Sequence, residues 1–415
     1  MSNKLLVPQI RFKEFTNAWE QEKLGECSKF YNGLTSVSKS DFGVGKDLYI
    51  DYLNVFNNTF SQFSELKKFK NSSRQNYVQF KDVILTISSE TPDEVAMSSV
   101  INWKNDYKNV AFNSFCILVR FNQLEKYDVN YIGYFFRSNS FRTQAMLMAQ
   151  GISRFNINQT ALKKTLFLFP PNIYEQQKIG NVLYYLDSLI TLHQRKLLSL
   201  KNLKSRLLDR MFCDEKSQFP SIRFKEFTNT WEQWKVGDLI TERIEFTKES
   251  NEFPLMAFVA NEGVVAKGER YDRSSLVRDI YNKIYKVTKY GDFIYSSNNL
   301  DRGSIGANKY GNACISPVYS IFKCTNSSDH NFIKNILSRH SFVNKLLKYR
   351  QGVVYGQLKI HESIFLNINL NSPSILEQNK IGKIFYNLDS LITLHQRKLN
   401  SLKNIKNTLL DKMFV

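Results

Sequence analysis

Two pairs of repeated segments constrain the fold of this chain more than any other feature of its sequence. The segment PQIRFKEFTNAWEQEKLG at residues 8–25 returns as PSIRFKEFTNTWEQWKVG at 220–237, with 14 of 18 positions identical. Residues 175–212 return at 377–414, with 28 of 38 positions identical. The centres between these repeats diverge. We therefore expect two domains that share a frame and a fold but not a surface.

The second repeated segment predicts a long helix in each half of the chain, because its apolar residues recur at steps of three and four. The stripe of the first copy comprises Leu183, Leu186, Ile190, Leu197, Leu200, Leu207 and Met211, with His193 and Lys204 at the remaining seam positions. The stripe of the second copy comprises Phe385, Leu388, Ile392, Leu399, Leu402, Leu409 and Met413, with His395 and Lys406 in the seam. Each helix of about 37 residues would be roughly 55 Å long.

The connection between the halves predicts how these helices pair. Only about seven residues separate Phe212 from Pro220, so the second helix has to run back along the first. We expect an antiparallel intramolecular coiled coil that holds the two variable domains at opposite ends. A polar residue in such a seam more often sets the register of the pairing than binds a ligand or senses pH. We interpret His193 and His395 in this way, with the other two roles left open.

The predicted fold class is α/β, with two β-rich mixed domains and a pseudo-two-fold internal repeat. Short strand-like runs such as VQFKDVILTISS, FNSFCILVRF, DFIYSSNN and YSIFKC indicate the strands. The spacing of apolar residues predicts one helix over 131–148 and another over 332–349. The expected boundaries are 1–170 for the first variable domain, 171–218 for the first long helix, 219–373 for the second variable domain and 374–415 for the second long helix.

The charge of the chain favours a polyanionic partner. Lysine and arginine number 57 against 38 acidic residues, a formal net charge of +19. An anionic membrane surface is the competing partner, but no apolar run approaches the ~18 residues that a membrane helix needs. No signal-peptide pattern opens the sequence, so we expect a cytoplasmic protein. The five cysteines are scattered, which indicates buried thiols rather than a disulfide framework or a zinc knuckle.

The motifs of a DNA-modifying enzyme are missing from the sequence. It contains no phosphate-binding G-x-x-x-x-G-K-[ST] loop, and Gly303-Ser304-Ile305-Gly306 lacks the context of a cofactor fold. Glu90, Asp93 and Glu94 are interpreted as a polar loop rather than a nuclease centre, and the histidines lack metal-ligand spacing. We therefore expect no catalytic residue and no metal site in this chain.

The order, spacing and duplication of IRFKEFTN-x-WE and EQ-x-K-IG…LDSLITLHQRKL resemble the specificity subunit of type I restriction-modification systems. The resemblance covers the whole chain. It implies that the variable centres are target-recognition domains, each reading one half of a bipartite site in double-stranded DNA. It also implies that the long helices act as a spacer and dock two modification (methyltransferase) subunits, with restriction (translocase and endonuclease) subunits completing the complex. The cofactors S-adenosylmethionine, ATP and Mg are then expected on those partners and none on this chain.

The resemblance places candidate DNA-binding residues after the strand that begins Asp-x-Ile and after the Gln-Gly pair. Polar side chains at these two places could form hydrogen bonds with base edges, although any single one is more often a solvated loop residue or a phosphate contact. In the first half they are Ser88, Ser89, Thr91, Arg154, Asn156, Asn158 and Gln159. In the second half they are Ser297, Asn298, Asn299, Arg302, Tyr355, Gln357, Lys359 and His361. The aromatic residues of the opening repeat, Phe12, Phe15 and Trp19 with Phe224, Phe227 and Trp231, are interpreted as packing anchors instead.

Two other functions stay open at this point. The chain could be the recognition end of a single-chain restriction-methylation enzyme, which would require catalytic motifs elsewhere in the chain. It could also be a basic coiled-coil adaptor for acidic proteins, but an adaptor gives no reason for two duplicated domains to keep a frame while their centres diverge. A steep salt dependence of DNA binding would separate a DNA reader from an adaptor.

Overall fold

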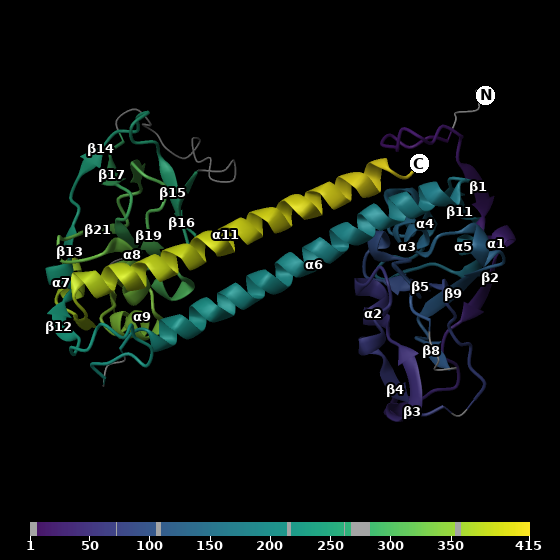
Figure 1. Ribbon diagram of the computed structural model, residues 1–415, viewed down its shortest axis with the longest axis horizontal. Helices are drawn as coiled ribbons and strands as arrows, with labels where there is room; N and C mark the ends of the chain where they lie inside the picture. The colour runs from purple at the N-terminus through teal and green to yellow at the C-terminus, as the bar shows by residue number, and fades with distance from the viewer. Residues whose placement is uncertain are drawn as a thin grey trace. The chain divides into compact units, whose positions relative to one another are not determined.

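The computed structural model describes residues 6–71, 73–104, 109–213, 217–260, 262–266, 283–352 and 358–415 (Figure 1). The chain forms two compact units. Unit 1 consists of Met1–Gln194 and Arg397–Val415, and unit 2 consists of Arg195–Gln396. Each unit thus contains one variable centre and a segment from each of two long helices, α6 (Ile173–Arg210) and α11 (Ile375–Lys412).

The variable centre of unit 1 is built on a four-stranded antiparallel sheet and a three-stranded sheet. The first has the order β2 (Ser28–Asn32), β9 (Cys116–Phe121), β5 (Val83–Thr86) and β7 (Ser98–Val100). The second has the order β4 (Lys67–Phe69), β3 (Phe42–Ile50) and β8 (Val110–Phe112), with β3 and β8 parallel. Two further strand pairs are β1 (Glu20–Lys23) with β11 (Leu166–Phe169), and β6 (Ser88–Ser89) with β10 (Phe155–Asn156). The short helices are α1 (Leu24–Cys27), α2 (Tyr52–Asn57), α3 (Val129–Phe135), α4 (Asn139–Met148) and α5 (Gln159–Lys164).

Unit 2 repeats the main sheet of unit 1 with the same strand order. Its four strands are β13 (Ile240–Glu242), β21 (Ser320–Cys324), β18 (Phe293–Tyr295) and β19 (Ile305–Ala307). Its other strands are β14 (Phe246–Thr247), β17 (Tyr285–Thr288) and β20 (Ala313–Ile315) in one sheet, and the pairs β15 (Met256–Val259) with β16 (Gly263–Ala266), β12 (Glu232–Lys235) with β24 (Asn369–Ser372), and β22 (Gln351–Gly352) with β23 (Leu358–Lys359). Its short helices are α7 (Val236–Leu239), α8 (His330–Leu337), α9 (His340–Leu347) and α10 (Glu362–Leu366). The α/β fold class is confirmed.

Each predicted helix of the variable centres is in fact a pair of helices, so the expectation of one helix over 131–148 and one over 332–349 was wrong. In unit 1 the break falls between α3 and α4, where the Ser138 hydroxyl donates to the Phe135 carbonyl at 2.7 Å. A serine that satisfies the last carbonyl of one helix competes with continuation of that helix. In unit 2 the break falls at Ser338, before α9 begins. Apolar spacing continues across both breaks and so conceals them.

Aromatic side chains from several elements form the core of each unit. In unit 1 the ring of Phe167 lies 4.7 Å from that of Phe135 and 4.9 Å from that of Phe121, measured between ring centroids. In unit 2 the ring of Phe365 lies 4.9 Å from that of Tyr295 and 4.9 Å from that of Phe322. Rings at such separations contribute beyond the area that they bury. These cores hold the sheets against the short helices behind them.

The two long helices run antiparallel within each unit, as the heptad stripes predict. In unit 1 Leu183, near the start of α6, shares a core with Met413, just beyond the end of α11. Lys406 Nζ lies 2.6 Å from Asp187 Oδ1 between the same two helices. In unit 2 the matching pair is Lys204 Nζ and Asp389 Oδ1, also at 2.6 Å.

The predicted seam positions, His193 and His395 included, are buried or half-buried in both helices. Among the apolar members, Leu186 and Leu409 pack in the core of unit 1, and Leu200, Leu207, Leu388 and Ile392 pack in the core of unit 2. No described helix combines the length and the apolar character needed to cross a membrane.

Candidate nucleic-acid interface

Residues of the opening repeat bind residues of the second repeat, and these contacts attach each variable centre to the long helices. The guanidinium of Arg11 donates to both carboxylate oxygens of Glu175 at 2.7 and 2.8 Å, and Glu175 is 1% exposed. In unit 2 Arg223 donates to Glu377 in the same way at 2.8 and 2.7 Å. Such bidentate pairs combine charge with a restricted geometry. The arginine of RFKEF and the glutamate of EQ-x-K-IG are therefore two halves of one contact.

Other residues of the second repeat anchor α3 and α8, the first short helix of each helix pair in the variable centres. The Gln176 side chain accepts a hydrogen bond from the Asp128 backbone at 2.9 Å and donates to the Pro170 carbonyl at 3.0 Å. In unit 2 Gln378 accepts from the Asp329 backbone at 3.1 Å. The lysine of the repeat lies over two phenylalanine rings of the opening repeat: Lys178 over Phe12 and Phe15, and Lys380 over Phe224 and Phe227.

The tryptophans of the opening repeat are buried anchors in both units. Trp19 is 3% exposed and lies 6.4 Å from the ring of Phe414, which follows α11. Trp231 is 1% exposed and lies 6.3 Å from the ring of Phe212, which follows α6. The interpretation of these residues as packing anchors fits their burial, since no base could reach them without unfolding the unit.

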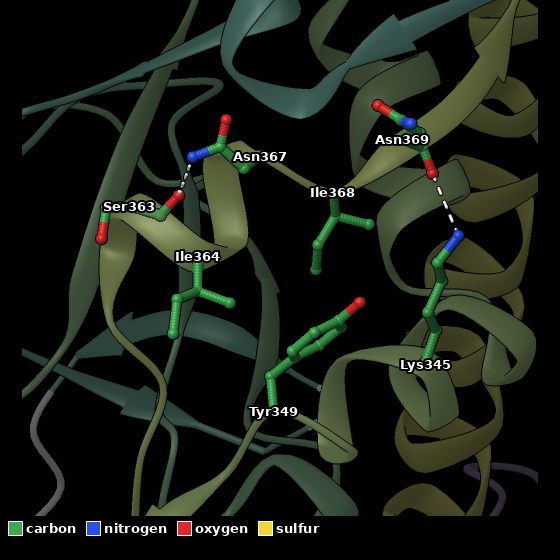
Figure 2. Close-up of a pocket in the computed structure, with 7 residues that line it drawn as sticks. All are labelled: Lys345, Tyr349, Ser363, Ile364, Asn367, Ile368 and Asn369. Atoms are coloured by element: carbon green, nitrogen blue, oxygen red, sulfur yellow. Dashed lines mark hydrogen bonds between the residues drawn. The ribbon is translucent and has the colours of Figure 1, made fainter.

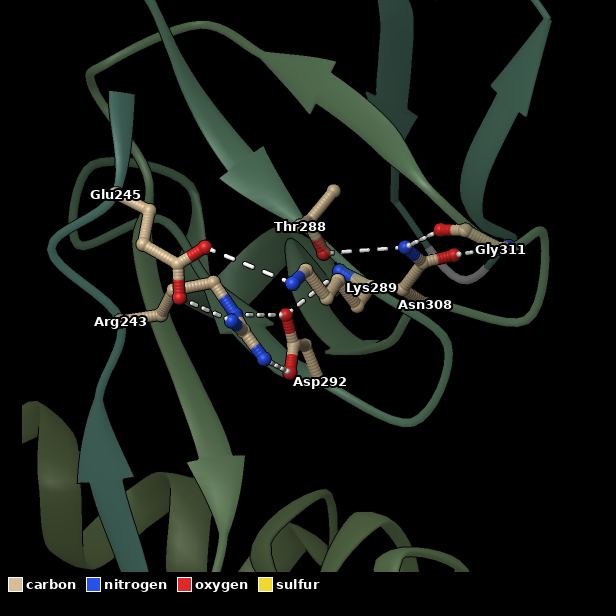
Figure 3. A network of polar contacts seen from close by, with 7 residues as sticks. All are labelled: Arg243, Glu245, Thr288, Lys289, Asp292, Asn308 and Gly311. Carbon is tan, nitrogen blue, oxygen red and sulfur yellow. Dashed lines mark hydrogen bonds and ion pairs between the residues drawn. The ribbon is translucent and has the colours of Figure 1, made fainter. Parts of the chain in front are cut away.

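The Asp-x-Ile strands begin with a buried carboxylate that an arginine neutralises. Asp82 accepts from Arg120 Nε and Nη2 at 2.8 and 2.6 Å, and burial raises the pKa of this carboxyl. In unit 2 Asp292 accepts from Arg243 Nε and Nη2 at 2.7 and 3.0 Å, and Arg243 also contacts Glu245 (Figure 3). The arginine lies in β9 in unit 1 and directly follows β13 in unit 2. These pairs position the strands that lead into the candidate loops.

In unit 1 the two candidate segments lie side by side although they are far apart in the sequence. Strand β6 pairs with β10, so that Ser88 faces Asn156 and Ser89 faces Phe155. The Gln150 and Asn156 backbones exchange hydrogen bonds at 2.9 and 2.8 Å and close a short hairpin. Gly151 in this hairpin has φ +145, and a Cβ there would lie 2.0 Å from the Arg154 carbonyl oxygen. Glycine is therefore required for the turn that presents Arg154.

The remaining candidates of unit 1 differ in how far the fold occupies their side chains. Asn158 caps α5 by accepting from the Ala161 backbone at 2.9 Å. Gln159 donates to the side chain of Asn32 at 2.7 Å. Thr91 is exposed just before the 3₁₀ turn Pro92–Glu94. Local structure thus accounts for Asn158 and Gln159, whereas Thr91 and Arg154 face solvent.

A hollow of about 470 Å³ opens beside these segments in unit 1. Three candidates line it together with side chains from α2, from the loop after β6 and from the turn before β9: Ser88, Ser89 and Arg154 with Tyr52, Leu53, Phe56, Glu90, Glu94 and Phe115. The Tyr52 hydroxyl donates to the Ser88 carbonyl at 2.7 Å, and burial raises the pKa of this tyrosine. The Tyr52 and Phe56 rings are stacked, 5.8 Å apart.

In unit 2 the same two segments meet through a different contact. The Ile360 backbone, which follows β23, donates to the Ser297 hydroxyl at 3.1 Å. Asn298, Asn299 and Arg302 lie exposed in the loop after β18. Arg350 Nη2 pairs with Asp301 Oδ1 in this loop at 3.0 Å.

The candidates after the Gln-Gly pair of unit 2 are described in part. Lys359 ends the hairpin of β22 and β23, and His361 stands at the start of α10, where its carbonyl accepts from the Ile364 and Phe365 backbones. Tyr355 and Gln357 lie outside the described residues. The loop after β18 and the base of this hairpin are therefore neighbours, as in unit 1.

A second hollow, of about 370 Å³, lies in unit 2 between α9, α10 and β24 (Figure 2). Lys345 Nζ there donates to the Asn369 carbonyl at 3.2 Å, and the Asn367 side chain donates to the Ser363 carbonyl at 2.9 Å. None of the candidate residues lines this hollow. Among the described residues, no group of three His, Cys, Asp or Glu is arranged to hold a metal ion.

Sequence reasoning missed the aromatic lining of the hollow in unit 1, and it interpreted Glu90 and Glu94 only as part of a polar loop. Tyr52, Leu53 and Phe56 come from α2, which lies well before the candidate segments in the sequence. The sequence pattern predicted Phe115 only as part of a strand, although its side chain is 57% exposed. A phenylalanine next to Asn113 and Ser114, two turn-forming residues, was the one signal that this ring lies outside the strand.

Two stretches of the chain, residues 17–202 and 228–404, match the family described as the type I restriction modification DNA specificity domain. Among solved structures, the S subunit of a type I restriction-modification system from M. genitalium is 17% identical, with 99% of each chain covered and a TM-score of 0.64. The HsdS subunit from Thermoanaerobacter tengcongensis is 16% identical over 95% of this chain and 96% of that one, with a TM-score of 0.44. The first of these likenesses supports the fold. Because the two family matches together span most of the sequence, the chain belongs to the type I restriction modification DNA specificity family.

Proposed function

We propose that each unit reads one half of a bipartite site in double-stranded DNA through its pair of neighbouring candidate segments. One observation carries this proposal. In both units the repeated residues form the contacts that hold the frame together, while the diverged segments after Asp-x-Ile and after Gln-Gly lie next to each other. A frame that stays constant while two neighbouring loops vary suits a reader of different sequences. The net charge of +19 favours the phosphate backbone as the common part of the target.

Exchanging residues 27–170 for the corresponding part of another family member tests the proposal. The exchange leaves Trp19, Arg11 and α6 in place, so the contacts of Arg11 with Glu175 and of Trp19 with Phe414 are kept. The expected outcome is a new sequence in one half of the methylated site, with the other half and the spacer unchanged. Mapping methylated adenines after incubation of DNA with the assembled complex measures this outcome. A change in both halves would contradict the assignment of one half-site to each unit.

We also infer that methyl transfer and cleavage depend on partner subunits that bring S-adenosylmethionine, ATP and Mg. The sequence offers neither a cofactor loop nor a metal-binding motif, which supports this division of labour. Incubating DNA and labelled S-adenosylmethionine with the chain alone, and then with its modification subunit added, tests the inference. Label should enter DNA only when both proteins are present. Methylation by the chain alone would favour the single-chain enzyme instead.

The outer face of each long helix is proposed as the docking surface for a modification subunit. Leu189 and Leu192 on α6 are 43% and 60% exposed, and their repeat counterparts on α11, Leu391 and Leu394, are 44% and 45% exposed. Exposed leucines at matching positions of a repeat suit two copies of one partner, one for each unit.

Charge substitutions at these leucines test the docking surface. Leu192→Lys should remove one of two bound modification subunits, and Leu192→Lys with Leu394→Lys should remove both, as measured by native mass spectrometry. Leu147→Lys, at an exposed leucine of α4 rather than of a long helix, serves as the control and should leave both bound. Full binding by the double variant would show that docking occurs elsewhere.

A further inference from the structure

The hollow of unit 1 has two chemically different walls. One wall is apolar and consists of Tyr52, Leu53, Phe56 and Phe115. Leu53 is 59% exposed and Phe115 is 57% exposed, so the fold leaves this apolar surface in contact with water. An apolar surface that a fold leaves uncovered and hollowed is suited to a binding partner.

The other wall is polar and carries both signs of charge. Glu94 is occupied, because the Ser89 hydroxyl donates to it at 2.9 Å. Glu90 and Arg154 line the same hollow and are exposed. Among the described residues neither of their side chains forms an ion pair. The hollow therefore combines an exposed carboxylate, Glu90, and an exposed guanidinium, Arg154, with an apolar surface.

A carboxylate at a DNA-facing site restricts what can bind there. It repels phosphate oxygens and accepts hydrogen bonds only from donors, and the donors on base edges in the major groove are the amino groups of adenine and cytosine. Of these two, only adenine belongs to a pair that also displays a methyl group, the 5-methyl of thymine. The adenine N7 and thymine O4 of the same pair are acceptors that suit an arginine.

We propose that this hollow reads an adenine–thymine pair in the major groove of one half-site. Glu90 accepts from the adenine amino group, the wall of Leu53 and Phe115 contacts the thymine methyl, and Arg154 donates to an acceptor of the same edge. The proposal rests on the proposed function, because it requires unit 1 to face DNA. The strand pair supports it, because Glu90 directly follows β6 and Arg154 directly precedes β10, and these two strands pair with each other.

Unit 2 provides an internal contrast. The loop that follows β18 carries the amides of Asn298 and Asn299, and the nearby carboxylate of Asp301 is paired with Arg350 at 3.0 Å. The free carboxylate of unit 1 thus has no counterpart in the described part of this loop. Recognition by a carboxylate and an apolar wall is therefore expected for one half-site only.

Two base analogues test the proposal by removing one group each from DNA. Deoxyuridine in place of thymidine removes only the 5-methyl group, and 2-aminopurine in place of adenine moves the amino group out of the major groove. Each analogue is placed singly at every adenine–thymine pair of both half-sites, after the exchange of residues 27–170 has assigned the half-sites. The dissociation constant of the full-length chain, assembled with its modification subunit, is measured for each duplex.

At one pair of the unit 1 half-site, each analogue should weaken binding at least about fivefold, the low end of what one good base contact contributes. Phe115→Ala should bind thymidine and deoxyuridine equally at that pair while still distinguishing adenine from 2-aminopurine. Glu90→Ala should show the reverse pattern. The control variants Leu147→Ala and Glu26→Ala change an exposed leucine and an exposed carboxylate outside the hollow, and should keep both sensitivities.

The possible failures are distinct from one another. If the assembled complex binds all DNA sequences equally, the proposed function itself is wrong. If binding is sequence-specific but neither analogue matters in the unit 1 half-site, only the reading by the hollow is overturned. The same conclusion follows if the sensitivities persist in Phe115→Ala and Glu90→Ala, or if they occur only in the half-site of unit 2.

Discussion

The two units share one frame, formed by the opening repeat and the ends of the long helices. The aromatic residue that packs on its tryptophan comes from a different place along the chain in each unit. In unit 2 the aromatic residue that packs on Trp231 is Phe212, which lies shortly before it in the sequence. In unit 1 the residue that packs on Trp19 is Phe414, which is supplied by the far end of the other long helix. The backbone repeats this pattern: Ile222 donates to Arg210, and Ile10 donates to Lys412, both at 2.8 Å. The duplicated segments therefore encode one structural unit, whose parts follow a different order along the chain in unit 1 and in unit 2.

A second difference lies where each helix pair meets its variable centre. Asp187 in unit 1 is contacted by Lys406 at 2.6 Å and by the Tyr134 hydroxyl at 2.8 Å. Its counterpart Asp389 in unit 2 is contacted by three lysines: Lys204, Lys309 and Lys334. A neutral hydroxyl in one unit and half-buried ammonium groups in the other thus contact the equivalent carboxylate. At this place the two units thus share their geometry but not their charge.

Breaking the frame pair should have the largest effect, and an equal one in both units. Arg11→Ala leaves the buried Glu175 carboxylate unpaired, and Arg223→Ala does the same to Glu377, at an expected cost of about 4 kcal/mol each. Hydrogen exchange, followed peptide by peptide, reports the opening free energy of each unit separately. Lys23→Ala, which removes an exposed ion pair with Glu26, is the control and should cost less than about 1 kcal/mol. A large effect on one unit and none on the other would contradict a shared frame.

Removing the charge of the helix aspartate should affect the two units differently. Asp389→Asn leaves the half-buried Lys334 and Lys204 without a carboxylate and should cost unit 2 about 3 kcal/mol. Asp187→Asn loses one ion pair but keeps an acceptor for Tyr134, so unit 1 should lose only about 1 kcal/mol. Equal losses, measured by the same exchange experiment, would show that the additional lysines of unit 2 have no energetic role.

The same aspartate predicts an acid-sensitive step in unit 2. Burial opposes ionisation, but the ammonium groups of Lys334 and Lys204 hold the pKa of Asp389 well below its usual range. A carboxyl whose folded-state pKa is depressed contributes stability above its unfolded pKa, about 3.9, and loses it as the pH falls below that value. Unfolding of unit 2 should therefore become easier below about pH 4 in the unmodified chain, and this slope should be smaller in Asp389→Asn. An unchanged slope would assign the acid sensitivity to other carboxyls.

Adding a methyl group at the helix glycines should also destabilise the two units by different amounts. A Cβ at Gly180 would lie 2.6 Å from the Tyr131 backbone nitrogen, whereas a Cβ at Gly382 would first meet the Asp329 side chain. Gly180→Ala should thus force a backbone shift costing about 2 kcal/mol. Gly382→Ala should cost about 1 kcal/mol, because it displaces the side chain that caps α8. Stabilisation of either unit, as expected for alanine in an exposed helix, would show that the close approach is absent.

The smallest expected difference concerns the tryptophans. Trp19 Nε1 donates to Glu175 at 3.3 Å, whereas Trp231 Nε1 is buried with no hydrogen-bond partner among the described residues. Trp19→Phe and Trp231→Phe create similar cavities, but only the first loses a hydrogen bond. Trp19→Phe should therefore cost about 1 kcal/mol more than Trp231→Phe in the exchange experiment. Equal costs would indicate that the Trp19 contact contributes nothing in solution.

The sequence predicted the frame well, because duplication and helical periodicity act over many residues. The stripes from Leu183 to Met211 and from Phe385 to Met413 identified the antiparallel helices, and the repeated Trp19 and Trp231 identified the anchors. The pairing of Arg11 with Glu175 was not predicted, since the two letters lie in different repeats and nothing in either one indicates its partner.

The candidate site was predicted only in outline, and its role in DNA binding stays a prediction. The Asp-x-Ile and Gln-Gly echoes located two segments that do meet, as the pairing of Ser88 with Asn156 shows. The lining residues from α2 could not be predicted, because they depend on tertiary contacts, whereas sequence patterns report the period of a single element. The capping role of Asn158 is local, since its side chain accepts from the Ala161 backbone three residues on, but α5 is too short to show a helical period.

The contact between Ile10 and Lys412 has a consequence for the order of events during synthesis. Unit 2 is one continuous stretch, Arg195–Gln396, so all of its residues are synthesised before the last helix segment of unit 1. The variable centre of unit 1 is translated first, yet the partner of its Trp19 arrives only with Phe414. Its core face is left open to water and to chaperones for most of translation. In this protein the first domain to be made is the last that can close.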